Sequence, residues 1–205
     1  SRSIFSLEPM LDRVPVPGAG LFRYPLESLL GLGKLNQAYD RAVNLPHQFC
    51  ESALEALGAA VHVGKVDLER VPKTGPVVVV ANHPFGGLEG LMMARVLLRV
   101  RPDVKLLANH LLSMIPQMDE VCIYVNPFES ARGSSANVKG LMTAMRYLRE
   151  GGVVGAFPSG EVSSLRLGER RVADPRWSKH IASMARRVNA TVIPMYFEGR
   201  NGALF

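Results

Sequence analysis

The chain has 205 residues, of which 47% are hydrophobic and 20% are charged, a balance that excludes a disordered chain and allows one α/β domain with a real core. Its formal net charge of +6 favours anionic partners, such as a membrane surface or an acidic carrier. The basic residues are scattered and form no recognition motif, so we expect no nucleic-acid partner. No apolar run reaches the roughly 18 residues that a membrane-spanning helix needs.

The two cysteines, Cys50 and Cys122, lie far apart and have no metal-ligand spacing. Nothing indicates a disulfide scaffold, so a reducing compartment is expected, with Cys122 in the core. Together with the positive charge, these features predict a cytoplasmic protein that lies peripherally on the inner face of the cell membrane.

The first part of the chain, residues 1–58, is expected to form an irregular arm followed by helices. Proline and glycine dominate residues 1–20, whereas apolar residues suit helices over 24–43 and 45–57. These helices either pack in the ordinary way or lay an apolar face on a lipid surface. Residues 60–66 alternate loosely in polarity and predict an edge strand.

From residue 59 to residue 205, strand and helix patterns alternate. Strands are predicted at 77–80, 104–108, 121–125 and 153–157, with a bent or edge strand at 191–197. Helices are predicted at 91–100, 137–149 and 178–188, with a short helical turn at 111–115. This order predicts the α/β class, with a largely parallel central sheet flanked by helices.

Three further expectations concern this domain. The helix over 137–149 should turn its apolar side chains to the core: Val138, Leu141, Met142, Met145 and Leu148. A basic loop is either a solvated surface or a functional element, and contains Arg166, Arg170 and Arg171. The last residues, 199–205, show no clear stop, so a longer parent protein is expected.

The most informative stretch, residues 77–90, joins a strand to a helix through a glycine-containing turn. Four valines are followed by Asn82-His83-Pro84, where the proline ends the strand, and then by Phe85-Gly86-Gly87. Glu89 opens the next helix. An imidazole and a carboxylate therefore lie at the carboxyl end of a strand, which is where ligands bind in open α/β sheets.

Three predicted strands end in unusual loops: Asn82 to Gly87, Asn126-Pro127-Phe128, and Pro158-Ser159-Gly160-Glu161. Parallel neighbouring strands would bring these loops to one edge of the sheet. The chain has no serine nucleophile elbow, no second histidine at metal-ligand spacing from His83, and no phosphate-binding glycine fingerprint. The pattern favours metal-free general-base catalysis by His83, with Glu89 as the nearest carboxylate to orient it. Backbone NH groups of the glycine turn or of the helix start are candidates for binding an oxyanion.

At these residues the chain resembles the lysophospholipid acyltransferase family, over roughly residues 64–200. It is most similar to a divergent branch of hemolysin-like proteins, with relatives in ornithine- and glycine-lipid synthesis. The family's first motif is Asn-His, four residues, then Asp; here Asn82-His83 is followed by five residues and Glu89. The family's Phe-Pro-Glu-Gly-Thr-Arg appears as a run from Phe157 to Val162, and its Val/Ile-Pro as Ile193-Pro194.

The resemblance implies that a fatty acyl group moves from acyl carrier protein or coenzyme A to the hydroxyl of a lyso-lipid, without a cofactor or metal. His83 would be the base and Glu89 its partner. Residues 157–161 would line the acceptor site. The substrate-binding residues as a whole would come from the three loops: Asn82, Phe85, Gly86, Gly87, Asn126, Arg132, Phe157, Pro158, Ser159, Gly160 and Glu161.

The acceptor itself is indicated by a departure from the family pattern. Relatives that acylate lyso-phosphatidic acid place arginines in the second and third motifs, whereas this chain has Asn126 and Phe128, then Glu161 and Val162. A carboxylate beside a phosphate is repulsive, and more so in a partly buried site. Glu161 therefore favours an acceptor with an amine, such as a lyso-aminolipid, although Arg132 supplies a nearby cation.

Three alternatives remain open at this stage. Lyso-phosphatidic acid is the second candidate acceptor. A hydrolase would use water at His83, and would consume thioester without an added acceptor. A non-catalytic module that binds lipid or carrier would keep its binding after His83→Ala and show no turnover.

Overall fold

The computed structural model describes residues 4–6, 31–45, 48–125, 135–166, 168 and 170–199. The chain forms two compact units, Ser1–Ala60 and Val61–Phe205. In the part of the chain described, no helix is both long and apolar enough to cross a membrane.

The described part of the first unit contains two helices, α3 (Leu32–Ala42) and α4 (Phe49–Ala56). The Arg41 guanidinium donates to the Ala56 carbonyl over 3.0 Å, and the Tyr39 and Phe49 rings meet edge to face. The helices predicted at 24–43 and 45–57 are thus confirmed over shorter spans, while residues 24–30 and 46–47 lie outside the described residues.

The second unit is built on a five-stranded sheet with the order β3-β2-β4-β1-β7. Its strands are β1 (Val77–Ala81), β2 (Val104–Asn109), β3 (Cys122–Val125), β4 (Val153–Ala156) and β7 (Thr191–Met195). Every neighbouring pair is parallel. The prediction of an α/β fold with a parallel sheet is confirmed, as is the expectation that the strand containing Pro194 lies at an edge.

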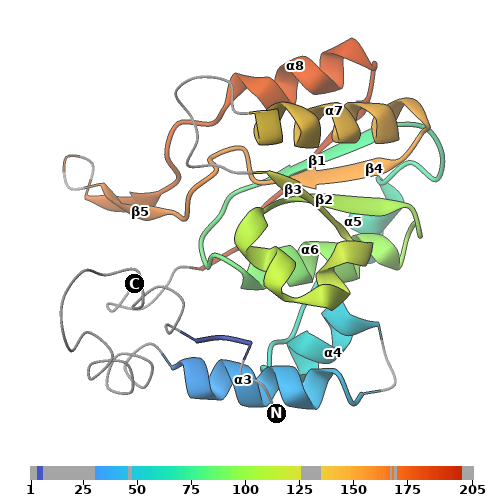
Figure 1. Cartoon of the computed structure of the whole chain (residues 1–205). Coiled ribbons are helices and arrows are strands. Elements are labelled where there is room, and N and C mark those ends of the chain that lie inside the picture. Colours follow the sequence, from blue (N-terminus) through green and yellow to red (C-terminus); the bar gives the residue numbers. More distant parts are fainter. Residues whose placement is uncertain are drawn as a thin grey trace. The chain divides into compact units, whose positions relative to one another are not determined.

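Helices cover both faces of this sheet (Figure 1). On one face lie α7 (Ser135–Arg149) and α8 (Lys179–Arg187), and on the other lies α6 (Leu88–Leu98). Shorter elements complete the unit: α5 (Lys65–Glu69) and two 3₁₀ helices, η2 (His110–Met114) and η3 (Pro116–Glu120).

The valine strand is central because both of its faces are buried. Val77, Val78 and Val79 have no exposed surface. Since successive side chains of a strand point to opposite faces, Val78 packs with Leu148 of α7 and Met184 of α8, whereas Val77 and Val79 face the α6 side. Central strands buried in this way read as continuous apolar runs.

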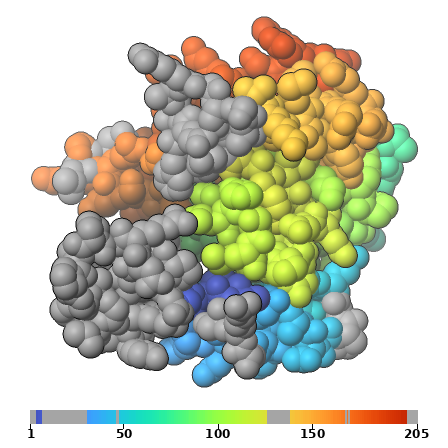
Figure 2. All heavy atoms as spheres, in the orientation of Figure 1, coloured from blue at the N-terminus to red at the C-terminus, as the bar shows by residue number. Residues whose placement is uncertain are grey.

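Two sequence predictions about the second unit are wrong. Residues 60–66 form no strand: residues 60–64 have no regular secondary structure, and Lys65 begins α5. The expected basic loop is a short antiparallel hairpin, β5 (Ser164–Arg166) and β6 (Arg171–Ala173), which projects from the domain (Figures 1 and 2). Strands of three residues are too short to show a recognisable alternation of apolar and polar residues in the sequence.

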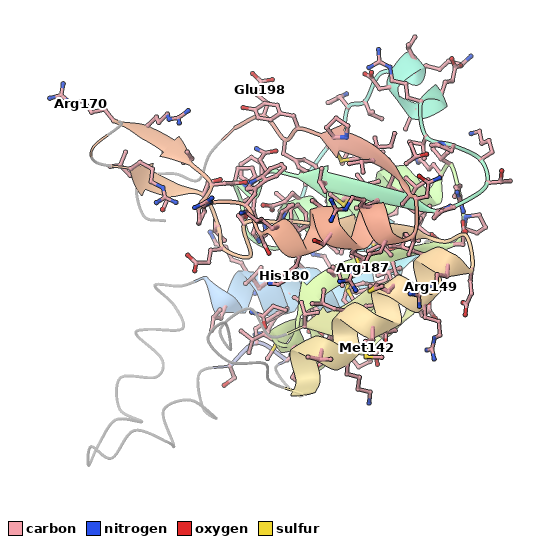
Figure 3. The ribbon with its side chains drawn as sticks, turned by 90° about the horizontal axis from the view of Figure 1, so that it is seen from above. Met142, Arg149, Arg170, His180, Arg187 and Glu198 are labelled. Atoms are coloured by element: carbon pink, nitrogen blue, oxygen red, sulfur yellow. The ribbon has the colours of Figure 1, made fainter. Side chains whose placement is uncertain are left out.

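The buried face of α7 also differs from the prediction. Ala144 and Leu148 have no exposed surface and Met145 packs beside them, but Met142 is 65% exposed and Val138 is 49% exposed. Each residue turns about 100° around the helix, so Met142 lies well away from the direction of Leu148. Figure 3 shows Met142 on the outer side of α7.

At the amino ends of the strands, a buried arginine joins three connections. Arg101 is 4% exposed, and its guanidinium donates to the carbonyls of Pro72, Gly75 and Gly151. It also pairs with Asp103, whose pKa is held below its usual value by this hydrogen-bonded guanidinium. Arg101 thereby fixes the segments that lead into β1, β2 and β4.

We expect Arg101→Ala to destabilise the domain by about 3 kcal/mol or more, because three carbonyls and one carboxylate lose their donor. Urea denaturation would measure this loss. Arg149→Ala, which removes an exposed arginine from the last turn of α7, is the matched control and should change stability by less than about 0.5 kcal/mol. A wild-type midpoint in Arg101→Ala would contradict the proposed clamp.

Candidate active site

His83 follows the end of β1, and its main chain is held from two sides. Its carbonyl accepts the NH of Ser163 over 2.8 Å, and its NH donates to Asp174 Oδ1 over 3.1 Å. The carboxyl end of β1 is therefore tied to the connection that follows β4. This arrangement sets the point from which the imidazole extends.

The imidazole is paired with a fully buried carboxylate. His83 Nδ1 lies 2.7 Å from Glu89 Oε1, and Glu89 has no exposed surface. The same oxygen accepts the NH groups of Phe85 and Gly86, over 2.9 and 3.0 Å. The predicted contact between His83 and Glu89 is confirmed, and it forms across a loop one residue longer than the family pattern.

The turn before α6 depends on Gly86, whose φ of +94° is the left-handed region that favours glycine. In this conformation its NH points at the carboxylate of Glu89, in the first turn of α6. The amides of Phe85 and Gly86 are thus already occupied by a carboxylate. Among the amides we expected to bind an oxyanion, these two are therefore not available for that role.

Burial raises the pKa of Glu89, but the hydrogen bonds from His83 and from the backbone outweigh it, so the pKa lies below its usual value. Glu89 is therefore ionised at neutral pH and can only accept hydrogen bonds. Nδ1 of His83 must then carry the proton, which leaves the lone pair on Nε2. An unprotonated Nε2 is what a general base requires.

The ring of His83 is oriented by stacking as well as by hydrogen bonding. Its centroid lies 4.5 Å from that of Phe157, and the two ring planes differ by 19°. Phe157 follows β4, the strand next to β1, and its ring also lies near Phe197 after β7. Because three neighbouring strands end at the same edge, side chains far apart in the sequence form one aromatic cluster that includes His83.

Asn82 joins the loops after β1 and β7. Its side-chain amide donates to the Phe197 carbonyl and accepts the Phe197 NH, both over 2.8 Å. The next loop residue, Glu198, is followed by Gly199, where a Cβ would lie 2.7 Å from the Phe85 ring. Asn82 thus positions the loop after β7; its predicted contact with substrate stays a prediction.

The third-motif residues form a turn beside the histidine loop. Gly160 has a φ of +68° and donates its NH to the Phe157 carbonyl, while Ser159 donates its hydroxyl to the Glu161 carbonyl. Pro158 is buried, and Glu161 is exposed. The next side chain, Val162, lies against Gly86, so Glu161 is at the rim of the histidine loop.

Two predicted substrate-binding residues, Asn126 and Arg132, lie outside the described residues. The loop that begins at Asn126 follows β3, which two strands separate from β1. The predicted convergence is confirmed for the loops after β1 and β4, and it stays a prediction for the loop after β3. Sequence reasoning missed the loop after β7, because Phe197 contributes through its main chain.

Asp174 is a further residue that sequence reasoning missed. Its Oδ1 accepts the NH of His83 and, over 2.5 Å, the hydroxyl of Ser163, while its Oδ2 accepts the indole NH of Trp177 over 2.8 Å. One carboxylate therefore ties the connection after β6 to the histidine. The signal in the sequence was an acid among basic residues, 91 positions from His83.

Among the described residues, no group of three or more histidine, cysteine, aspartate or glutamate side chains is arranged to hold a metal ion. The described site instead consists of one imidazole, two carboxylates that each bind three donors, and aromatic rings around the histidine.

Comparison with known proteins agrees with this geometry. A family model described as Acyltransferase matches residues 62–198. The chain belongs to the Acyltransferase family. The match covers every strand of the central sheet together with His83, Glu89 and Asp174.

Two relatives are both named lyso-glycine lipid O-acyltransferase. The protein from Phocaeicola vulgatus is 29% identical over 158 residues, which cover 77% of this chain and 53% of the relative. The protein from Bacteroides thetaiotaomicron is 30% identical over 172 residues, which cover 83% of this chain and 59% of the relative. The chain thus spans little more than half the length of these relatives.

We expect Glu89→Gln to lower kcat by about a hundredfold or more, because a neutral amide would not stabilise the imidazolium of a His83 that acts as the predicted base. The KM for the acyl donor should change by less than about threefold, since the substitution keeps the shape of the side chain. Steady-state kinetics with a fixed acceptor measure both constants. A kcat equal to that of the wild type would show that the carboxylate charge has no part in turnover.

We expect Asp174→Asn to lower kcat by about tenfold to a hundredfold, because an amide cannot accept from all three donors and the His83 main chain is left less well held. Emission from Trp177, the single tryptophan of the chain, should change at the same time. The control is Asp119→Asn, which alters a carboxylate bonded to Tyr124 and should leave both readouts unchanged. Unchanged kcat together with altered Trp177 emission would rule out the positioning role.

Proposed function

We propose that the protein is an O-acyltransferase that moves a fatty acyl group from an acyl thioester to the hydroxyl of a lyso-aminolipid. The observation that carries the proposal is the contact of His83 Nδ1 with the buried, ionised Glu89, which leaves Nε2 as a base. Membership of the Acyltransferase family and two relatives named for lyso-glycine lipid support the same reaction class.

In this mechanism His83 Nε2 takes the proton of the acceptor hydroxyl as its oxygen attacks the thioester carbonyl. The new C–O bond forms a tetrahedral oxyanion, for which the proposed donors are backbone NH groups at the start of α6. Glu89 meanwhile stabilises the imidazolium. When the intermediate collapses, the C–S bond breaks and the imidazolium returns its proton to the departing thiolate of coenzyme A or acyl carrier protein.

The acceptor is proposed from the charge beside the site. Glu161 is exposed at the rim of the histidine loop, where relatives that use lyso-phosphatidic acid carry threonine before arginine. A carboxylate in this position disfavours a phosphate and favours an amino-acid lipid. In the same proposal, Asn126 and Arg132 contribute from the loop after β3 and complete the substrate contacts.

The proposal places the protein on the inner face of the cell membrane, where a lyso-lipid acceptor is presented. The net charge of +6 would draw it to anionic lipid headgroups. The N-terminal helices are proposed to contribute an apolar contact with the lipid surface, as the sequence led us to expect.

A competition assay tests the proposal by offering lyso-glycine lipid and lyso-phosphatidic acid together with one acyl thioester. We expect the lyso-glycine lipid to be acylated preferentially and the preference to weaken in Glu161→Ala. His83→Ala should lower turnover by about 10²–10⁴-fold, the usual contribution of a general base.

Preference for lyso-phosphatidic acid that is unchanged in Glu161→Ala would contradict the proposed acceptor. Thioester consumption that needs no acceptor would show a hydrolase. Acceptor and donor binding without turnover, and unaffected by His83→Ala, would show a binding module.

A further inference from the structure

The hairpin β5–β6 extends away from the sheet and contributes nothing to the core. Leu165 is 60% exposed, and Arg170 and Arg171 are also exposed. Figures 1 and 2 show the hairpin as a projection from the domain, and Figure 3 places Arg170 at its far end. Packing in the core therefore does not explain which residues stand in this hairpin.

The pairing register gives the hairpin two different faces. Leu165 pairs with Val172, and Arg166 pairs with Arg171. Directly opposed residues share a face and successive residues alternate, so one face is aliphatic and the other carries two arginines side by side. The hairpin is therefore amphipathic over only three pairs of residues.

The opposed arginines work against the hairpin in isolation. Like charges directly across a pair of strands are destabilising, and a two-stranded hairpin is only marginally stable by itself. Between residues 164 and 179 the chain has five cationic residues and two acidic ones, Glu169 and Asp174. The hairpin and the segment after it therefore carry a net positive charge, which an anionic surface would attract.

The base of the hairpin is held against the histidine. Ser163, just before β5, donates its NH to the His83 carbonyl, and Asp174, just after β6, accepts the His83 NH. Trp177, which is 43% exposed, is bonded to the same Asp174. Whatever the hairpin binds is thereby kept close to the loop of His83.

We propose that the β5–β6 hairpin docks the domain on an anionic lipid surface. The arginines bind lipid phosphates, for which the planar guanidinium is well suited, and Leu165 and Trp177 enter the interfacial layer. The inference rests on the proposed function in one respect: docking would hold His83 near an acceptor that lies in the membrane. It assigns the docking to the hairpin of the second unit.

An acidic carrier protein would also match the positive charge. A lipid surface accounts for more of the observations, because the same short element exposes an aliphatic face and a nearby tryptophan together with its arginines. That combination is typical of segments that lie at a membrane interface. The hairpin from Ser164 to Ala173 is also small beside the roughly 800 Å² that each partner buries in a standard protein–protein interface.

Vesicle co-sedimentation without any substrate tests the proposal. The vesicles are phosphatidylcholine, alone or with phosphatidylglycerol, and the probe variant is Arg166→Gln/Arg170→Gln/Arg171→Gln. Since each arginine near an anionic surface contributes about fivefold, we expect about a hundredfold weaker binding to the anionic vesicles. Leu165→Ser should weaken binding further, and added salt should weaken binding of the wild type.

The matched control removes three arginines from the opposite end of the sheet. Arg149, Arg186 and Arg187 are exposed in the last turns of α7 and α8, the helices that lead into the amino ends of β4 and β7. Arg149→Gln/Arg186→Gln/Arg187→Gln changes the net charge equally and should keep wild-type binding within about threefold. Circular dichroism and thermal unfolding check that both triple variants are folded.

Trp177 provides a second readout, because it is the single tryptophan. Its emission should shift to shorter wavelength when anionic vesicles are added to the wild type, and should not shift in the hairpin variant. Equal losses in both triple variants would overturn the proposal in favour of net charge. Unchanged vesicle binding in the hairpin variant, with lost binding to an acidic acyl carrier protein, would overturn it in favour of that partner.

Failure of the proposed function is distinguishable from failure of the docking. Binding that depends on the hairpin, in a protein without acyl transfer, supports the docking and removes the reaction. Acyl transfer to an acceptor in anionic vesicles that is equally fast in the wild type and in the hairpin variant removes the docking and keeps the reaction.

Discussion

The site depends on one buried carboxylate. Glu89 has no exposed surface, yet it is ionised, because one of its oxygens accepts an imidazole NH and two backbone NH groups. The position of that oxygen fixes the turn from Phe85 to Gly86, the start of α6 and the tautomer of His83. A buried charge is tolerated only when it is bound in this way. The same contacts that allow Glu89 in the core therefore also orient the imidazole of His83.

The parallel sheet supplies the rest of the arrangement. Because β4 and β7 flank β1, their following residues, Phe157 and Phe197, reach the histidine loop from both sides. The side-chain amide of Asn82 holds the loop after β7 by hydrogen bonds to the Phe197 main chain, and Asp174 holds the connection after β6 by accepting the His83 NH. At the opposite end of the sheet, Arg101 joins the segments that enter three of the strands. Stability and chemistry are thus separated between the two ends of the strands.

Local pattern was sufficient to predict much of this. The four valines identify the central strand, and proline and glycine mark the turn that presents His83. The sequence also identified Glu89 as the partner of His83, because the helix begins directly after that turn. The sequence did not show whether the carboxylate could reach the ring across the longer loop, since this depends on the left-handed conformation of Gly86 and on the length of a glutamate side chain.

The missed features share a physical cause. They arise from contacts between segments far apart in the sequence, and such contacts leave no repeating local pattern of apolar and polar residues. The β5–β6 hairpin has strands too short for a pattern, and Phe197 acts through its backbone. Asp174 is brought to His83 from 91 positions away. Met142 was misassigned because it lies at the margin of the apolar face of α7, where the sequence does not show how far the neighbouring core extends.

The central claim is that Glu89 holds His83 with its proton on Nδ1 and its lone pair on Nε2. Nitrogen NMR of ¹⁵N-histidine-labelled protein measures this directly, with His83→Gln used to assign the signals. At a pH where the ring is neutral, the account predicts a protonated Nδ1 and an unprotonated Nε2 for His83. A neutral ring with its proton on Nε2 would contradict the account, because that nitrogen could not then accept the proton of an acceptor hydroxyl.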